Sequence, residues 1–222
     1  MTANPKRLPS YSREEEIANS ISHLIGLIFA VGTLVFFFIE SLINHLGFIY
    51  MLPYYVYSLC MMMVFFVSSF YHSSKFGSKR RAVTRIIDHC DIYAFVAATY
   101  FPICVYGLTN KLMSIAIMII EVALAIAGIV INLIPKNNKA LNIIAYIIYI
   151  IDGWLMIFFY PFGSGLAFTP FLFILLGGII YSIGAITYAI GSKKKWFHSI
   201  FHVFVVLAAI TQFIGIYFIF MS

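Results

Sequence analysis

The chain of 222 residues is 63% hydrophobic and only 10% charged, and its mean hydropathy is +1.00. Soluble domains average roughly 45–50% apolar and 25% charged residues, so the composition excludes a soluble globular domain and predicts an all-α integral membrane protein. The net charge of +6 is typical of basic loops beside an anionic membrane leaflet, and in this composition it does not indicate a nucleic-acid partner. Because no linker-like segment interrupts the chain, we expect one domain over residues 1–222.

The N-terminal stretch is predicted to lead into the first membrane span. Residues 1–11 are polar and read as a flexible lead, and residues 12–20 as a short interfacial helix. Ser12, followed three residues later by Glu15, fits a capping box, in which each residue satisfies a backbone N–H of the other. The sequence shows neither the basic start nor the small-residue cleavage site of a signal peptide, so we expect the first apolar run to be a retained span.

Seven apolar runs are long enough to cross a bilayer of roughly 30 Å. They cover residues 21–39, 53–73, 87–106, 112–134, 141–159, 170–190 and 197–220. Pro102 is expected to kink the third run. Alternate loops collect thirteen of the fourteen basic residues on one side and leave only Lys111 on the other. The positive-inside rule then places the N-terminus in the cytoplasm and the C-terminus outside.

Two histidines at the start of the last run point to a metal site. His198 and His202 are four residues apart, which places them on one face of a helix with Cβ atoms about 6 Å apart. Two imidazoles so placed can hold one metal ion. The alternative is a pair of interfacial histidines capped by water.

Two further segments bring candidate residues to the same predicted depth in the membrane as His198 and His202. His72 precedes Lys75 by three residues, and Asp88 follows Arg85 by three. Three neutral imidazoles, from His72, His198 and His202, suit Zn²⁺ and leave its fourth position for water, whose pKa zinc can lower to about 7. Asp88 would then either orient that water as a general base or bind the metal directly.

Other polar residues at about this depth in the membrane each allow more than one role. Ser68 lies one helical turn before His72, where its hydroxyl either supports the site or bonds back to the carbonyl of Val64. Asp91 lies one turn from Asp88 and could face the same site, whereas the intervening His89 is offset around the helix. Cys90 is a minor candidate ligand.

Two more sets of polar residues lie within the predicted spans. Glu16, Asn19 and His23 form a stripe that could line an entrance, brace the site or make up an interfacial amphipathic turn. Glu121 and Asp152 lie deeper, where they either pair with polar groups or mark a proton or ion path. The sequence does not choose among these alternatives.

These residues resemble the haemolysin III family, which is grouped with the progestin and adipoQ receptors and more distantly with the alkaline ceramidases. The matching stretches are EEIANSISHLIG from Glu15, SSFYH ending at His72, IDHCDIYAFVAATYFP from Ile87, GGIIYSIGAITY from Gly177 and HSIFH from His198. They are spread over nearly the whole chain. The succession S-x-x-x-H, D-H and H-x-x-x-H in that order is specific, although each piece alone would be weak.

The resemblance implies a seven-helix fold with the N-terminus inside and zinc near the cytoplasmic face. By similarity, His72, His198 and His202 would be the zinc ligands, Asp88 would hold the water, and Ser68 would lie nearby. Two positions depart from the pattern expected for the family. Asp91 stands where the family usually has a small or apolar residue, and Asp152 stands where an apolar residue is expected.

Three functions are compatible with this reading. The first is a zinc-dependent hydrolase of a lipid amide or ester bond, with Asp88 and Ser68 as catalytic residues and membrane lipids as partners, in a bacterial plasma membrane. The second is a cytolytic pore-forming protein, with Glu121 and Asp152 lining a path. The third is a receptor-like membrane sensor in which zinc is structural.

Overall fold

A computed structural model describes residues 11–134, 139–162, 164–191 and 194–222 and shows, within them, only helices and connecting turns. Seven helices are long and apolar enough to cross a membrane. They are α1 (Arg13–Ile43), α2 (Phe48–His72), α3 (Lys79–Pro102), α4 (Lys111–Leu133), α5 (Lys139–Phe159), α6 (Phe168–Gly191) and α7 (Phe197–Phe220). Each predicted span coincides with one of them, which confirms the expectation of a multi-pass, all-α membrane protein.

The first helix begins where the sequence predicts. The hydroxyl of Ser12 accepts the N–H of Glu15 at 3.3 Å, and the N–H of Ser12 donates to the Glu15 carboxylate at 2.9 Å, which confirms the capping box. From there α1 runs without a break for 31 residues, so the stretch predicted as a short interfacial helix forms its first turns. At 1.5 Å per residue α1 is about 46 Å long and exceeds the hydrocarbon thickness. Most of the predicted flexible lead, residues 1–10, lies outside the described residues.

The predicted kink at Pro102 corresponds to a change in helical winding. The α-helical hydrogen bonding of α3 ends at Pro102, and a short π-helix, η2 (Ile103–Gly107), continues it. Proline lacks the N–H that an α-helix would use at that position. A short 3₁₀ turn, η3 (Tyr160–Phe162), similarly follows α5.

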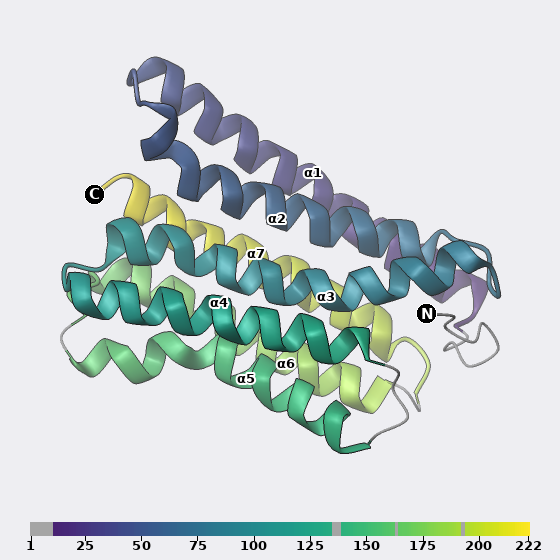
Figure 1. Ribbon diagram of the computed structural model, residues 1–222. Helices are drawn as coiled ribbons and strands as arrows, with labels where there is room; N and C mark the ends of the chain where they lie inside the picture. Colours follow the sequence, from purple (N-terminus) through teal and green to yellow (C-terminus); the bar gives the residue numbers. More distant parts are fainter. Residues whose placement is uncertain (1–10, 135–138, 163, 192–193) are drawn as a thin grey trace.

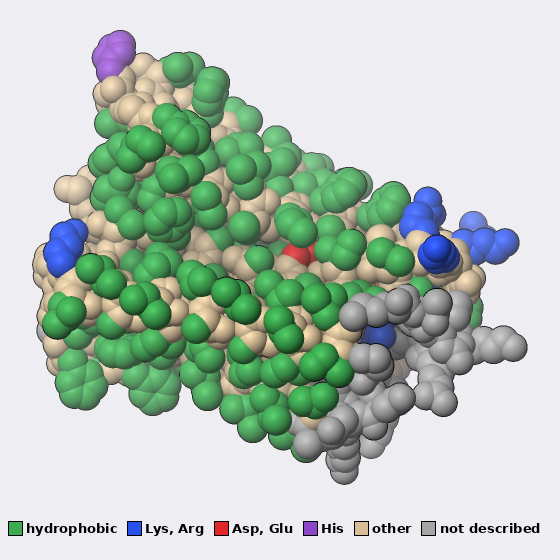
Figure 2. All heavy atoms as spheres, viewed as in Figure 1, with side chains coloured by type: hydrophobic (Ala, Val, Ile, Leu, Met, Phe, Trp, Pro, Cys, Tyr) green, Lys and Arg blue, Asp and Glu red, His purple; other side chains and the backbone are tan. Residues whose placement is uncertain are grey.

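Successive helices run in opposite directions, so the connections alternate between the two ends of the bundle (Figure 1). The start of α1 lies at the same end as the α2–α3 and α6–α7 connections, and the C-terminus lies at the other (Figure 1). On the face shown in Figure 2, hydrophobic side chains cover most of the helices, and the visible Lys and Arg side chains lie toward the two ends. Side chains such as Leu112 and Ile49 are 81% and 78% exposed, as expected for helix faces that contact lipid.

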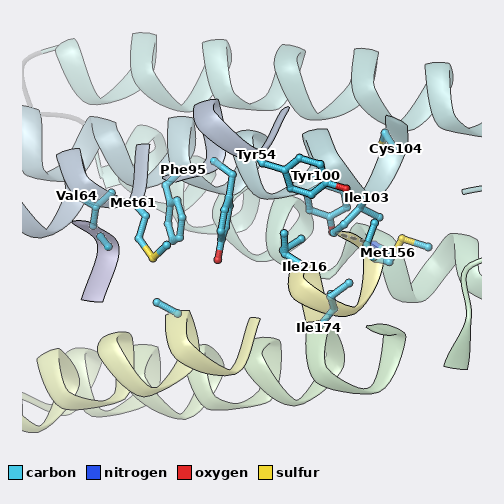
Figure 3. Close-up of a cluster of buried hydrophobic side chains, with 14 of the residues drawn as sticks. Tyr54, Met61, Val64, Phe95, Tyr100, Ile103, Cys104, Met156, Ile174 and Ile216 are labelled. Carbon is cyan, nitrogen blue, oxygen red and sulfur yellow. Dashed lines mark hydrogen bonds between the residues drawn. The ribbon is translucent and has the colours of Figure 1, made fainter. Parts of the chain in front are cut away.

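The core is filled by large side chains from most of the helices. Tyr54 and Met61 of α2, Phe95 of α3 and Ile216 of α7 are among the buried members of this cluster (Figure 3). Helix α7 packs against α1 and α6, and α2 packs against α1 and α3. This arrangement brings the beginning of α7 next to the beginning of α1 and the end of α2.

Candidate metal centre

Three histidines from two helices converge at this end of the bundle. His72 is the last residue of α2, and His198 and His202 lie in the first two turns of α7. All three side chains are buried. The Nε2 atom of His198 lies 3.3 Å from Nε2 of His72 and 3.0 Å from Nε2 of His202. One ring nitrogen from each residue can be chosen so that all lie within 4.8 Å of one another, and this group could hold a metal ion.

The spacing fits a small tetrahedral ion. Two nitrogen ligands held at 2.0–2.1 Å from zinc with tetrahedral angles are about 3.3 Å apart, close to the separations of Nε2 of His198 from Nε2 of His72 and of His202. The donor set is made of imidazole nitrogens, which zinc and several other transition metals accept. The described residues therefore supply three converging nitrogens that could serve as metal ligands.

Glu16 of α1 fixes the orientation of the His72 ring. Its carboxylate lies 2.7 Å from Nδ1 of His72, and the side-chain amide of Asn19 lies 3.4 Å from the same atom. An ionised carboxylate accepts hydrogen bonds but cannot donate one, so Nδ1 of His72 carries the hydrogen and Nε2 presents its lone pair to the site. Such carboxylate–histidine pairs orient metal ligands and raise their basicity.

Glu16 is itself held by Arg81, a residue near the start of α3. The Arg81 guanidinium forms an ion pair with Glu16, donates to the carbonyl of Ser74 at 3.0 Å and lies over the Tyr71 ring. Arg81 is almost fully buried, so removal of its carboxylate partner would leave a desolvated charge. The contacts of Glu16 and Asn19 with His72 favour the interpretation of the α1 stripe as a brace for the site.

The neighbouring carboxylate, Glu15, positions the start of α7. It accepts the backbone N–H of Trp196 at 2.7 Å, immediately before that helix begins. Trp196 has a φ of 70°, a left-handed conformation that costs a non-glycine residue free energy and needs support from its surroundings. His198 follows two residues later, with the ring of Tyr11 stacked on it at a centroid distance of 4.4 Å. Burial in this contact raises the pKa of the Tyr11 hydroxyl.

His23, the third member of the α1 stripe, lies against the three-histidine cluster without belonging to the three-nitrogen group. Its ring centroid is 4.0 Å from that of His202. Within the described residues, neither ring nitrogen of His23 has a hydrogen-bond partner, and the same holds for Nδ1 of His202. A fourth buried imidazole therefore adjoins the candidate ligands.

Ser68 and Asp88 lie on the neighbouring helices α2 and α3, and the side chain of Ser68 is buried. Asp88 is not part of the three-nitrogen group. Its assignment as the residue that holds water, and that of Ser68 as its partner, stay predictions.

The other residues singled out near Asp88 have different surroundings. The Nδ1 atom of His89 lies 2.8 Å from the carbonyl oxygen of Arg85, so this ring turns back to its own helix. Asp91 is buried, and neither carboxyl oxygen has a hydrogen-bond partner among the described residues. Cys90 and Asp91 do not belong to the three-nitrogen group.

Three contacts were not expected from the sequence: Glu15 with Trp196, Arg81 with Glu16, and Tyr11 with His198. Glu15 was assigned to the capping box, which it also forms. Arg81 lies in a run of basic residues that all indicate the cytoplasmic side equally well, so the sequence does not distinguish Arg81 from its neighbours. The one available signal for Arg81 was its position at the same predicted membrane face as Glu16.

Comparison with known proteins gives a consistent result over almost the full length. The family model described as "Haemolysin-III related" matches residues 11–213. The chain is 31% identical over 209 residues to a protein of Bacillus subtilis (strain 168) named "Hemolysin-3 homolog", covering 94% of this chain and 95% of that protein. It is 33% identical over 208 residues to "Hemolysin-3" of Bacillus cereus, covering 92% and 91%. The chain therefore belongs to the haemolysin III-related family of membrane proteins.

Proposed function

We propose that this protein is a zinc-dependent hydrolase that cleaves an amide or ester bond of a membrane lipid. The observation that carries the proposal is the convergence of three buried imidazole nitrogens, from His72, His198 and His202, in a seven-helix membrane protein. Polar groups buried within a membrane protein are costly and are usually functional. A zinc ion bound there would polarise the scissile carbonyl group and lower the pKa of water toward 7.

The protein's own residues would orient a metal ligand and accept the proton of the attacking water. Glu16 keeps the hydrogen of His72 on Nδ1, so that Nε2 faces the site. Asp88 would accept the proton of the attacking water as general base, and the Ser68 hydroxyl, from the neighbouring helix α2, would hold the carboxylate in place. A membrane-lipid substrate would reach the site from the bilayer. The distant resemblance of the haemolysin III family to the alkaline ceramidases favours an amide substrate.

The test is hydrolysis of a labelled ceramide and a labelled phospholipid ester by the purified protein in lipid bicelles. We expect turnover that a chelator abolishes and added Zn²⁺ restores. His202→Ala should abolish turnover, and Asp88→Asn should lower kcat by about 10²–10⁴-fold, the range typical for removal of a general base. Turnover that survives in His202→Ala would contradict the proposal.

A matched control exists in the α1–α2 turn. His45 is exposed and has a φ of 53°, a conformation that asparagine tolerates, so His45→Asn removes an imidazole without disturbing the fold. This variant should retain full activity. Loss of thermal stability in the His202 variant, with no turnover in the wild type, would instead favour a sensor with a structural metal.

The name "Hemolysin-3" of the Bacillus cereus relative supports a second candidate, permeabilisation of membranes. Purified protein in dye-loaded liposomes distinguishes the two functions. Leakage that is unaffected by His202→Ala would favour the second candidate over hydrolysis.

A further inference from the structure

The ring of Tyr11 lies on the candidate metal centre, although Tyr11 precedes the first helix. The ring is nearly parallel to the His198 imidazole, with an interplanar angle of 8° and a centroid distance of 4.4 Å. Its centroid is 6.1 Å from that of the His72 ring. Tyr11 stands directly before Ser12, the N-cap of α1. A residue from the segment before α1 therefore covers one face of a candidate ligand on α7.

Helix capping does not account for this position of the Tyr11 ring. The residue before an N-cap often packs on the fourth residue of its own helix when both are hydrophobic. In α1 that fourth residue is Glu16, whose carboxylate contacts His72 and Arg81. The Tyr11 ring packs instead on α7, almost at the other end of the chain.

One carboxylate fixes the register between the two segments. Oε2 of Glu15 accepts the N–H of Ser12 at 2.9 Å, and that N–H belongs to the peptide group that joins Tyr11 to Ser12. Oε1 of Glu15 accepts the N–H of Trp196 at 2.7 Å, two residues before His198. Glu15 is buried, so water competes little for these bonds. The backbone next to each stacked ring is therefore tied to the same group.

The stacked ring restricts His198 in two ways. It fixes the plane of the imidazole, whose Nε2 lies 3.3 Å from Nε2 of His72 and 3.0 Å from Nε2 of His202. It also covers the imidazole at the end of the bundle where α1 starts (Figure 1). His198 is only 8% exposed, although it is the second residue of its helix. Apolar groups around a metal site control the access of solvent to it.

We infer that Tyr11 is a positioning residue of the candidate metal centre, which fixes the His198 ring and shields the three-nitrogen group from the aqueous phase. The inference rests on the metal ion of the proposed function but on no particular reaction. Loss of the Tyr11 ring lets the imidazole turn and admits water and competing ligands. A bound metal ion should then leave the site faster, although its three nitrogen ligands are still present.

The test is the rate at which an excess of chelator removes zinc from the purified protein in lipid nanodiscs. Tyr11→Ala should bind zinc but release it about 2–10-fold faster, the factor to which the free energy of a stacked aromatic pair corresponds. Tyr11→Phe retains the ring and should release zinc at the wild-type rate, because the hydroxyl group is not part of the stack. Tyr50→Ala is the matched control, since Tyr50 lies near the start of α2, at the other end of the bundle.

A second measurement, on the metal-free protein, separates a failure of this inference from a failure of the proposed function. Diethyl pyrocarbonate modifies accessible histidines, and mass spectrometry of peptides locates the modified residue. Tyr11→Ala should raise the modification rate of His198 and leave that of the exposed His45 unchanged, which also shows that the variant is folded.

The outcomes are distinct. A wild type that binds no zinc would contradict the proposed function, and faster modification of His198 in Tyr11→Ala would still support the cover. Zinc release from Tyr11→Ala at the wild-type rate, or unchanged modification of His198, would overturn the inference and leave the proposed function standing. Release from Tyr11→Phe as fast as from Tyr11→Ala would also overturn it, because the stacked ring would then not be what retains the metal.

Discussion

At the scale of single residues, the candidate metal centre is built as much by α1 as by the helices that carry the histidines. Glu16 orients His72, Asn19 lies beside the same ring, and His23 packs against His202. Glu15 holds the backbone that precedes α7. The first three turns of α1 therefore set the geometry of ligands from two other helices.

Glu16→Gln should weaken metal binding without abolishing it. The amide cannot accept the Nδ1 proton with the strength of a carboxylate, and it leaves the buried Arg81 without its ion-pair partner. Loss of such a partner typically lowers metal affinity about 10–100-fold. Competition with a fluorescent zinc chelator measures the affinity, and Glu14→Gln, at an exposed position of the same helix turn, is the control. Equal affinities for the wild type and Glu16→Gln would show that this pair does not tune the site.

The candidate ligands could be predicted from the sequence, whereas much of their support could not. His198 and His202 share a helix, so their spacing alone determined that they are neighbours, and His72 was placed beside them by depth. Glu15 and Tyr11 act across the bundle on residues almost at the other end of the chain. Such contacts depend on which helices are adjacent, and hydropathy and charge alternation contain no information on that.

At the scale of the helices, the sequence was most informative about where spans exist and how the first one starts. Hydrophobic runs and the capping box are local features, and both appear in the structure. The continuity of α1 from Arg13 was not expected, because the polar stripe near its start resembles an interfacial turn. Asn19 and His23 of that stripe are buried and Glu16 is half-buried, and they contact side chains of α2, α3 and α7, which explains why one helix continues through the stripe.

The contact between α1 and α2 leads to a prediction about packing. A Cβ atom added at Gly26 would lie 2.6 Å from Cδ1 of Phe65, a buried ring of α2. Gly26→Ala should therefore force the helices apart and cost about 1–3 kcal/mol, as overpacked cores do. Gly32→Ala, on the same helix with nothing within 4 Å of the added atom, should be neutral or slightly stabilising. Unfolding in mixed detergent micelles compares the two, and equal stabilities would argue against this close approach.

At the scale of the whole molecule, the alternation of charged loops leads to a proposed orientation. The start of α1 and the basic α2–α3 connection lie at one end of the bundle (Figure 1). The histidine cluster lies at the same end, because it is formed by the last residue of α2 and the first turns of α7. We propose that this end faces the cytoplasm, since thirteen of the fourteen basic residues belong to that side in the sequence. The metal centre would then lie near the cytoplasmic face.

Reporter fusions test this orientation. Alkaline phosphatase fused after Ser222 should be active, and the same enzyme inserted after Gly77 in the α2–α3 connection should be inactive. Green fluorescent protein should give the reverse pattern, because it becomes fluorescent only when it folds in the cytoplasm. Phosphatase activity at Gly77 together with fluorescence at Ser222 would invert the orientation.

The claim on which the proposed function depends most is that the three histidines hold a metal ion. Metal analysis by mass spectrometry of protein purified without added chelator tests it most directly. We expect close to one zinc ion per chain in the wild type and in His45→Asn, and loss of zinc in His72→Ala, His198→Ala and His202→Ala. A wild type without stoichiometric zinc, or a His202→Ala variant with its full content, would contradict the claim.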